Sequence, residues 1–366
     1  MKSRYARSSW LGLLLLAVVL CVAAGLRLYR LDELPPGLYQ DEAYNGLDAL
    51  ALAQGLPFPR LHEEWERVAF GDEVASLSQG RFPVFLAGNY GREPLFHYLL
   101  ALSVAAVGAR PLAIRLVPAI VGILVVPAVF WLGWELVLGT GRHGRQRALR
   151  VGLWSAACVA VWYWLIHFSR FGIRPILLPW TASLAFAALS RGLRTGQKWA
   201  WAVGGFWIGL CAYTFASARM LPLVAGGWFL LAARCHPGLI RRRWREWVLA
   251  LAVAVVIFAP LGLFFLRHPE WFWLRSRYVV SDNLETESLG ERYLNNAGRV
   301  IKGFFVHGEE NLRHNLPGRP MLDPVQSLWF VVGIAGAGVR LVRRGTGGRC
   351  RQSVVTDGLL LPGALE

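Results

Sequence analysis

Nine apolar runs, separated by short charged connectors, dominate the chain. Backbone groups inside lipid must be satisfied within their own segment, which an isolated run achieves only as an α-helix. Hydrophobic residues make up 55% of the 366 residues, more than an ordinary soluble domain contains. The sequence therefore predicts an all-α fold, a polytopic transmembrane helical bundle with two large external loops. The runs lie at about residues 10–26, 94–108, 115–138, 151–168, 175–190, 199–215, 219–233, 247–266 and 326–341.

The distribution of charge predicts the orientation of the bundle. Nearly all of the 23 acidic residues lie in two segments, 27–93 and 267–323. Arg and Lys dominate the short connectors at 142–150, 191–198, 234–245 and 340–344. Positive charge confined to short loops marks the cytoplasmic side. We therefore expect a multi-pass protein of the cytoplasmic (inner) membrane with a cytoplasmic N-terminus. The same pattern argues against nucleic acid as a partner, despite a formal net charge of +16.

The runs also predict how the chain is divided. Residues 1–266 form a transmembrane core that includes the first external loop, 27–93. Residues 267–325 form the second external loop, 326–344 the last transmembrane helix and 345–366 a polar tail. The first run lacks a small-x-small cleavage site before Arg27, so we expect a retained signal anchor. An odd number of crossings must connect the first loop to the basic connector 142–150. Either the short run 94–108 enters the membrane and returns, or one connector does not follow the charge rule, and we expect a run 94–108 that is broken or does not span.

An acidic pair, Asp41-Glu42, lies just beyond the first apolar run. The connector Pro35-Pro36-Gly37 breaks the chain, and residues 42–54 are predicted to form a short amphipathic helix. Its expected apolar face contains Ala43, Leu47, Leu50 and Ala51. One interpretation is that Asp41 only caps this helix. The functional interpretation is a general base that activates an acceptor hydroxyl or amine, or a ligand for an ion that does so.

Basic residues at the start of the next apolar segments are candidates for binding an anionic headgroup. Arg92 and His97 flank the point where the chain enters the membrane again. Arg115 interrupts an apolar stretch, where a charge is costly and is expected to be paired or functional.

Three further arginines lie at predicted external hairpin tips, where positive charge is disfavoured. Arg170 and Arg174 belong to one tip and Arg219 to the next. Converging guanidinium groups bind a phosphate in bidentate fashion. Ion pairs with the acidic first loop are the alternative, and the sequence does not decide between the two.

No metal centre is predicted. The five cysteines show no CxxC spacing, and the polar segment His307–His314 matches no known ligand pattern. We therefore expect no cofactor, and a divalent cation stays an open alternative.

Five segments together resemble the GT-C membrane glycosyltransferases, and are most similar to the bacterial branch of glycosyltransferase family 39, the protein O-mannosyltransferase and aminoarabinose transferase superfamily. The segments are LYQDEAYNGLDALALAQG at 38–55, REPLFHYLLAL at 92–102, RPLAIRLVPAIVGIL at 110–124, HFSRFGIRP at 167–175 and RHNLPGRPMLDP at 313–324. The resemblance covers residues 10–342. Family members commonly continue with further helices, so the polar tail predicts a compact or C-terminally truncated member.

The resemblance implies roles for individual residues. Asp41 matches the catalytic acid of the first external loop, with Glu42 beside it. Arg92 matches the basic residue associated with the donor phosphate. Arg115, Arg170 and Arg174 fall on positions that resemble basic residues near the lipid phosphate.

The predicted function is transfer of a sugar from a polyprenyl-phosphate donor to an unknown acceptor at the outer face of the membrane. The catalytic residues would be Asp41 and Glu42. The donor phosphate would be bound by Arg92, His97, Arg115, Arg170, Arg174 and Arg219. Two alternatives stay open. A transporter or flippase of a lipid-linked anion would explain buried arginines but predicts inverted repeats, which the sequence does not show. A non-catalytic membrane subunit or fragment is the other.

Overall fold

The computed structural model describes residues 2–55, 82–86, 91–138, 141–235, 238–274, 289–311 and 314–345. Within these residues all regular secondary structure is helical, and the single β-type pairing is an isolated bridge between Leu86 and Arg92. The predicted all-α class is confirmed for this part of the chain. Most of the first external loop and the polar tail lie outside it.

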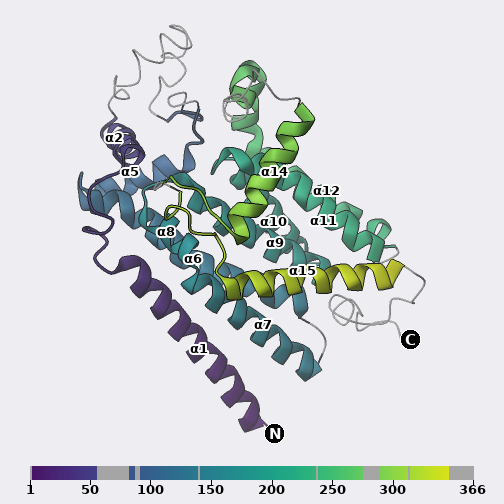
Figure 1. Ribbon diagram of the computed structural model, residues 1–366. Helices are drawn as coiled ribbons and strands as arrows, with labels where there is room; N and C mark the ends of the chain where they lie inside the picture. The colour runs from purple at the N-terminus through teal and green to yellow at the C-terminus, as the bar shows by residue number, and fades with distance from the viewer. Residues whose placement is uncertain are drawn as a thin grey trace.

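Figure 1 shows the helices of the described residues. They are α1 (Lys2–Leu28), α2 (Gln40–Gln54), α5 (Leu95–Val107), α6 (Pro111–Val137), α7 (Gly141–Val161), α8 (Tyr163–Arg170), the 3₁₀ turn η2 (Arg174–Ile176), α9 (Leu177–Thr195), α10 (Lys198–Cys211), the 3₁₀ turn η3 (Ala216–Met220), α11 (Leu221–Cys235), α12 (Leu239–Arg267), α14 (Leu289–Phe305) and α15 (Pro324–Gly345). Those from α5 to α12 follow one another with short connections.

Among the residues that the structure describes, five helices are long and apolar enough to cross a membrane. They are α1 from Trp10 onward, α6, α9 with η2, α11 with η3, and α12. The pair α7 and α8 would be a sixth span, bent by 57° at Trp162. The chain is therefore a multi-pass membrane protein by the length and composition of its helices.

Two of the nine apolar runs form helices shorter than a full span requires, and a third run forms a longer helix, α15, whose apolar part is short. Helices α5 and α10 have 13 and 14 residues, and the apolar part of α15 covers Pro324–Val339. At 1.5 Å per residue, 13 residues extend about 20 Å, less than the ~30 Å hydrocarbon core. By this length α5 alone does not span the membrane, and whether residues 94–108 enter it and return stays a prediction. Helix α10 ends early because Tyr213 and Thr214 turn the chain through backbone bonds to Leu210 and Cys211.

Helix α6 forms the centre of the bundle and contacts α1, α5, α7, α8 and α9. A buried apolar cluster joins it to its neighbours through Leu100 of α5, Val121 of α6, Leu165 of α8 and Leu177 of α9. This packing fixes the point at which α6 begins, and therefore the position of the polar residues in its first turns.

Small residues allow α10 to pack closely against α12. A Cβ atom on Gly209 would lie 2.6 Å from the carbonyl oxygen of Ala254, and one on Gly205 would overlap the carbonyl oxygen of Ala250. Glycine at i and i+4 facing alanine at i and i+4 is the small-residue packing typical of membrane helices.

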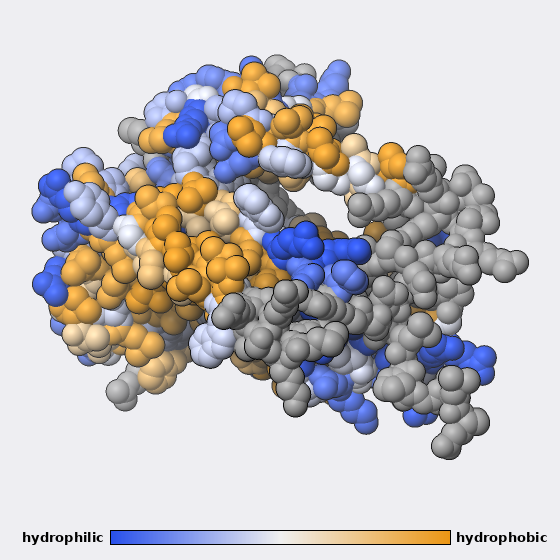
Figure 2. Space-filling view, turned by 90° about the horizontal axis from the view of Figure 1, so that it is seen from below, coloured by the Kyte–Doolittle hydropathy of each residue, from blue (hydrophilic) through white to orange (hydrophobic). Residues whose placement is uncertain are grey.

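Apolar side chains are exposed over wide areas of the described surface. Leu223 of α11, Val256 of α12 and Trp329 of α15 are each about 70% exposed, at 69%, 70% and 69%. Figure 2 shows a broad apolar area over one half of the face in view, with hydrophilic residues gathered at its margins. Such an area would be unfavourable in water and is the surface expected against lipid chains.

Candidate functional site

Polar side chains gather where α1 ends and α6 begins, which we call the loop end of the bundle. Figure 1 places α2, α5 and α8 together in this region, away from the N-terminus. Helix α2 packs against α5, and the turn after α8 lies against α2. Four segments distant in sequence therefore meet at the loop end.

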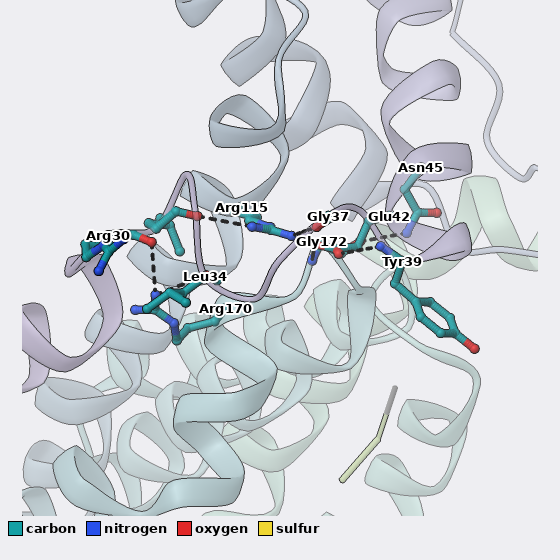
Figure 3. A network of polar contacts seen from close by, with 10 residues as sticks. Arg30, Leu34, Gly37, Tyr39, Glu42, Asn45, Arg115, Arg170 and Gly172 are labelled. Atoms are coloured by element: carbon teal, nitrogen blue, oxygen red, sulfur yellow. Dashed lines mark hydrogen bonds and ion pairs between the residues drawn. The ribbon is translucent and has the colours of Figure 1, made fainter. Parts of the chain in front are cut away.

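Glu42 lies at the centre of this meeting point and is fully buried. Its Oε2 accepts a hydrogen bond from the Tyr39 amide at 3.0 Å, which closes the first turn of α2. Its Oε1 accepts from the Gly172 amide at 2.8 Å and from Arg115 Nε at 3.3 Å (Figure 3). A Cβ atom on Gly172 would overlap the side chain of Ile114, so glycine at this position allows the turn after α8 to lie close to α6 and to Glu42. Glu42 thus joins α2, α6 and the turn after α8.

Arg115 supplies the opposite charge from the second turn of α6 and is 1% exposed. Besides Glu42, it donates to the carbonyl oxygens of Leu31 and Gly37 in the connector between α1 and α2. The expectation that Arg115 is paired is therefore confirmed. A buried ion pair contributes little to stability by itself, but removing one partner leaves a costly unpaired charge.

A second buried pair joins Arg92 to Asp48 of α2. Asn45 stands between the two pairs: its Nδ2 donates to the Gly172 carbonyl at 2.8 Å, and its Oδ1 lies 3.1 Å from His97 Nε2. His97 is completely buried. Arg92 and His97 therefore contact α2 in this structure, and their predicted role in binding a donor phosphate stays a prediction.

A third group of charges is centred on Glu93, which is 1% exposed. Its two oxygens accept from Arg174 at 3.0 Å and from Arg219 at 3.2 Å. Arg219 also lies over the rings of Phe265 and Phe272 and donates to the Phe272 carbonyl. For Arg174 and Arg219 the structure shows the ion pairs with the first loop that the sequence left as the alternative to phosphate binding.

Arg27 and Arg170 hold α1 against α7 and α8, because Arg27 of α1 caps the end of α7 and Arg170 of α8 caps the end of α1. Arg27 is fully buried in the last turn of α1 and donates to the carbonyls of Val159 and Ala160, in the last turn of α7, and to Ser169. Arg170, at the end of α8, donates to the carbonyls that close α1 and begin the connector: Leu26, Arg27, Tyr29, Arg30 and Leu34. A cation at a helix C-terminus is stabilised by the unpaired carbonyls and the helix dipole.

Helix α2 buries polar residues together with two alanines. Its buried residues are Glu42, Asn45, Asp48, Ala49 and Ala51, whereas Leu47 of the expected apolar face is 38% exposed. The amphipathic pattern did not indicate which side of the helix is buried, and the surface that α2 covers carries Arg92 and Arg115, which pair with Asp48 and Glu42. Charged partners attract the polar face.

Asp41 differs from its neighbour because it keeps part of its surface exposed. Tyr39 occupies the N-cap position, and Glu42 satisfies the Tyr39 amide, so the interpretation that Asp41 merely caps the helix is not supported. Asp41 lies in the first helical turn, where the helix dipole favours a negative charge. It is the acidic residue of the pair that a substrate can approach.

Sequence reasoning missed Asp48, Asn45 and the partner role of Glu93. Asn45 and Asp48 follow Glu42 at intervals of three residues, which places all three on one helix face. This spacing is the signal in the sequence from which their position on one helix face could have been predicted. Outside the loop end, sequence reasoning also missed Glu135, which is buried near the C-terminal end of α6. Glu135 accepts hydrogen bonds from Arg191 at 3.2 Å and from Arg194 Nε at 3.0 Å, near the C-terminal end of α9.

The segment after α14 packs against α8. Asn315 is buried and accepts a hydrogen bond from the Tyr163 hydroxyl at 2.5 Å, while Trp162 and Trp164 donate to the carbonyls of Met321 and His314. His314 contacts Glu309, and His307 contacts Glu310. Among the described residues no group of three or more His, Cys, Asp or Glu is placed to hold a metal ion.

No protein-family model matches the chain, and comparisons with curated proteins and with solved structures give no significant match. The family resemblance therefore stays a prediction from the five sequence segments.

Proposed function

We propose that this protein is a membrane glycosyltransferase that transfers a sugar from a polyprenyl-phosphate donor to an acceptor hydroxyl or amine, at the outer face of the cytoplasmic membrane. The observation that carries the proposal is the position of Asp41. It is a partly exposed carboxylate in the first turn of α2, next to a fully buried Glu42 that three hydrogen bonds hold in place. This arrangement supports a general base with a fixed backbone position.

In the proposed reaction, Asp41 takes the proton of the acceptor as its oxygen or nitrogen attacks the anomeric carbon. The bond between that carbon and the phosphate oxygen breaks, and polyprenyl phosphate leaves with the electron pair. The leaving group gains negative charge, which nearby guanidinium groups offset. Arg170 and Arg219 are the two of the five predicted donor-binding arginines that are not buried. Both already donate to groups of the chain, Arg170 to backbone carbonyls and Arg219 to Glu93 and the Phe272 carbonyl. In the proposal they exchange part of these hydrogen bonds for the first contacts with the donor phosphate.

The buried residues have a supporting role in this proposal. Glu42 and Arg115 fix the start of α2 against α6, and Asp48 with Arg92 fixes its next turn. This differs from direct catalysis by Glu42, because all of its oxygen contacts are already made inside the protein. These two buried ion pairs keep Asp41 at a fixed depth relative to the lipid-embedded helices.

The experiment compares Asp41→Asn with Asp32→Asn in purified protein reconstituted into liposomes. Asp32 is an exposed carboxylate in the connector before α2, so it controls for loss of surface charge. The assay supplies radiolabelled polyprenyl-phosphate hexoses and pentoses with membrane extract as the acceptor source, and follows release of polyprenyl phosphate. Loss of a general base lowers the rate by about 10²–10⁴-fold, so we expect this loss for Asp41→Asn and none for Asp32→Asn.

Equal rates for the wild type and Asp41→Asn would contradict the catalytic assignment. If the wild-type chain moves labelled lipid between leaflets and transfers no sugar with any donor, the protein is a transporter and the proposal fails.

A further inference from the structure

Helix α14 has one apolar side that the rest of the described chain leaves exposed. Leu294 is 75% exposed, Ile301 61% and Val300 56%. At 3.6 residues per turn these side chains fall within one half of the helix surface, together with Phe304 and Phe305. The side is too large and too continuous to be a scatter of surface residues.

The other half of α14 is polar and has a basic excess. Asn295, Asn296, Arg299 and Lys302 lie on it and are exposed. Over Leu289–Phe305 the sequence contains three basic residues and one acidic residue, Glu291. A helix with this division and this charge suits the boundary between lipid chains and negatively charged headgroups.

The apolar side of α14 continues into the surface of α15. Phe304 and Phe305 pack against Phe330 of α15, with ring centroids 6.3 and 5.9 Å apart. Helix α15 is apolar, and its Val325 and Trp329 are 64% and 69% exposed. The two helices therefore present one connected apolar surface, of which the α15 part has the composition of a membrane segment.

We propose that α14 binds an anionic lipid surface and lies in the headgroup region with its apolar side toward the lipid chains. The continuity with apolar α15 and the basic excess of the polar half of α14 together favour an anionic lipid surface over a second copy of the chain. Arg299 and Lys302 would then face phosphate groups. This inference does not depend on the proposed glycosyltransferase activity.

Such binding would also fix the segment that follows α14. Met321 and Leu322 donate backbone hydrogen bonds to the carbonyls of Gly303 and Phe304, at 3.0 and 3.1 Å. The same segment holds α8 through Asn315 and Tyr163. A lipid-bound α14 would therefore set the height of this segment relative to the start of α8.

The test places a photoreactive diazirine analogue of leucine at Leu294 or at Asn296 in the full chain. Both positions are exposed, and two residues in a helix are about 200° apart around its axis, so they face opposite sides. The protein is reconstituted in nanodiscs of equal phosphatidylglycerol and phosphatidylcholine, illuminated, and its adducts are identified by mass spectrometry. We expect a lipid adduct at 294 and none at 296, with unchanged melting temperatures.

A second arm tests the charge. Arg299→Gln combined with Lys302→Gln is expected to abolish the excess of phosphatidylglycerol over phosphatidylcholine in the adduct, whereas Arg241→Gln with Arg242→Gln, an exposed basic pair on α12, leaves it unchanged. Crosslinks from 294 to another copy of the chain, crosslinks within the chain, or addition of water alone would each overturn the proposal. Equal labelling of both lipids by the wild-type sequence would overturn the anionic preference.

Discussion

Replacing Glu42 by Gln tests whether the loop end is held together by a buried charge pair. The carboxylate accepts from three donors, at 3.0, 2.8 and 3.3 Å, and is fully buried. The side-chain oxygen of glutamine can replace one carboxylate oxygen, but its NH2 group then faces an N–H donor in place of the other oxygen. Arg115 also loses its counter-charge. Breaking a buried pair in this way costs about 3–5 kcal/mol. Because Arg115 keeps two carbonyl contacts, we expect a value near 3 kcal/mol, about 10²-fold in the folding equilibrium.

The assay is reversible unfolding in mixed micelles with increasing SDS, which gives the free energy of unfolding. Glu33→Gln is the matched control, since Glu33 pairs with Arg30 on the surface and both side chains are more than half exposed. Exposed pairs contribute roughly 0–1 kcal/mol. Adding Arg115→Met to Glu42→Gln removes the unpaired charge and is expected to recover about 1 kcal/mol or more.

The result that would refute this reasoning is a Glu42→Gln variant as stable as Glu33→Gln. A double variant less stable than the sum of both single changes would also contradict it. In either case the contacts of Glu42 would not hold α2 in place, and the rigid position of Asp41 would lose its physical basis.

Two further predictions concern the packing of the helices. Gly205→Leu forces side-chain atoms into the Ala250 carbonyl and is expected to cost at least about 1–3 kcal/mol in the same unfolding assay. The control Gly226→Leu is expected to change stability little, because an added Cβ there would meet no atom within 4 Å. Equal effects of the two variants would show that α10 and α12 are not closely packed. Arg27→Met removes four hydrogen bonds of a buried guanidinium and is expected to cost about 2–4 kcal/mol, while Arg30→Met at the surface costs less than about 1 kcal/mol; a difference below about 1 kcal/mol would contradict the capping role.

The helices could be predicted from the sequence because lipid allows so few alternatives. A long apolar run such as 115–138 must be helical whatever it packs against, and α6 covers it. The residues at which helices end are set by local turns, which the sequence shows less clearly. Helix α10 stops at Cys211 because Tyr213 and Thr214 turn, although the apolar composition continues to residue 215.

The site was harder to predict because its partners are distant in sequence. Glu42 and Arg115 are 73 residues apart, and Glu93 and Arg219 are 126 apart. Arg115 was recognised as a charge that needs a partner, but no local pattern identifies Glu42 as that partner. The side that α2 buries could not be predicted for the same reason. An apolar face predicts burial only when the opposing surface is apolar, and the residues that make this surface charged lie in later segments.

The capping of α7 by Arg27 and of α1 by Arg170 imposes an order on the assembly of the protein during synthesis. Arg170 leaves the ribosome 143 residues after Arg27. At about 5–20 residues per second this interval is roughly 7–30 s. Throughout it the end of α1 lacks its capping cation, and Arg27 lacks the carbonyls of α7. A charge without partners is costly in hydrocarbon, so in this period α1 must keep Arg27 in contact with water or with the insertion machinery. Only when α7 and α8 arrive can α1 move to its final depth, which makes the bent pair the element that completes the first half of the bundle.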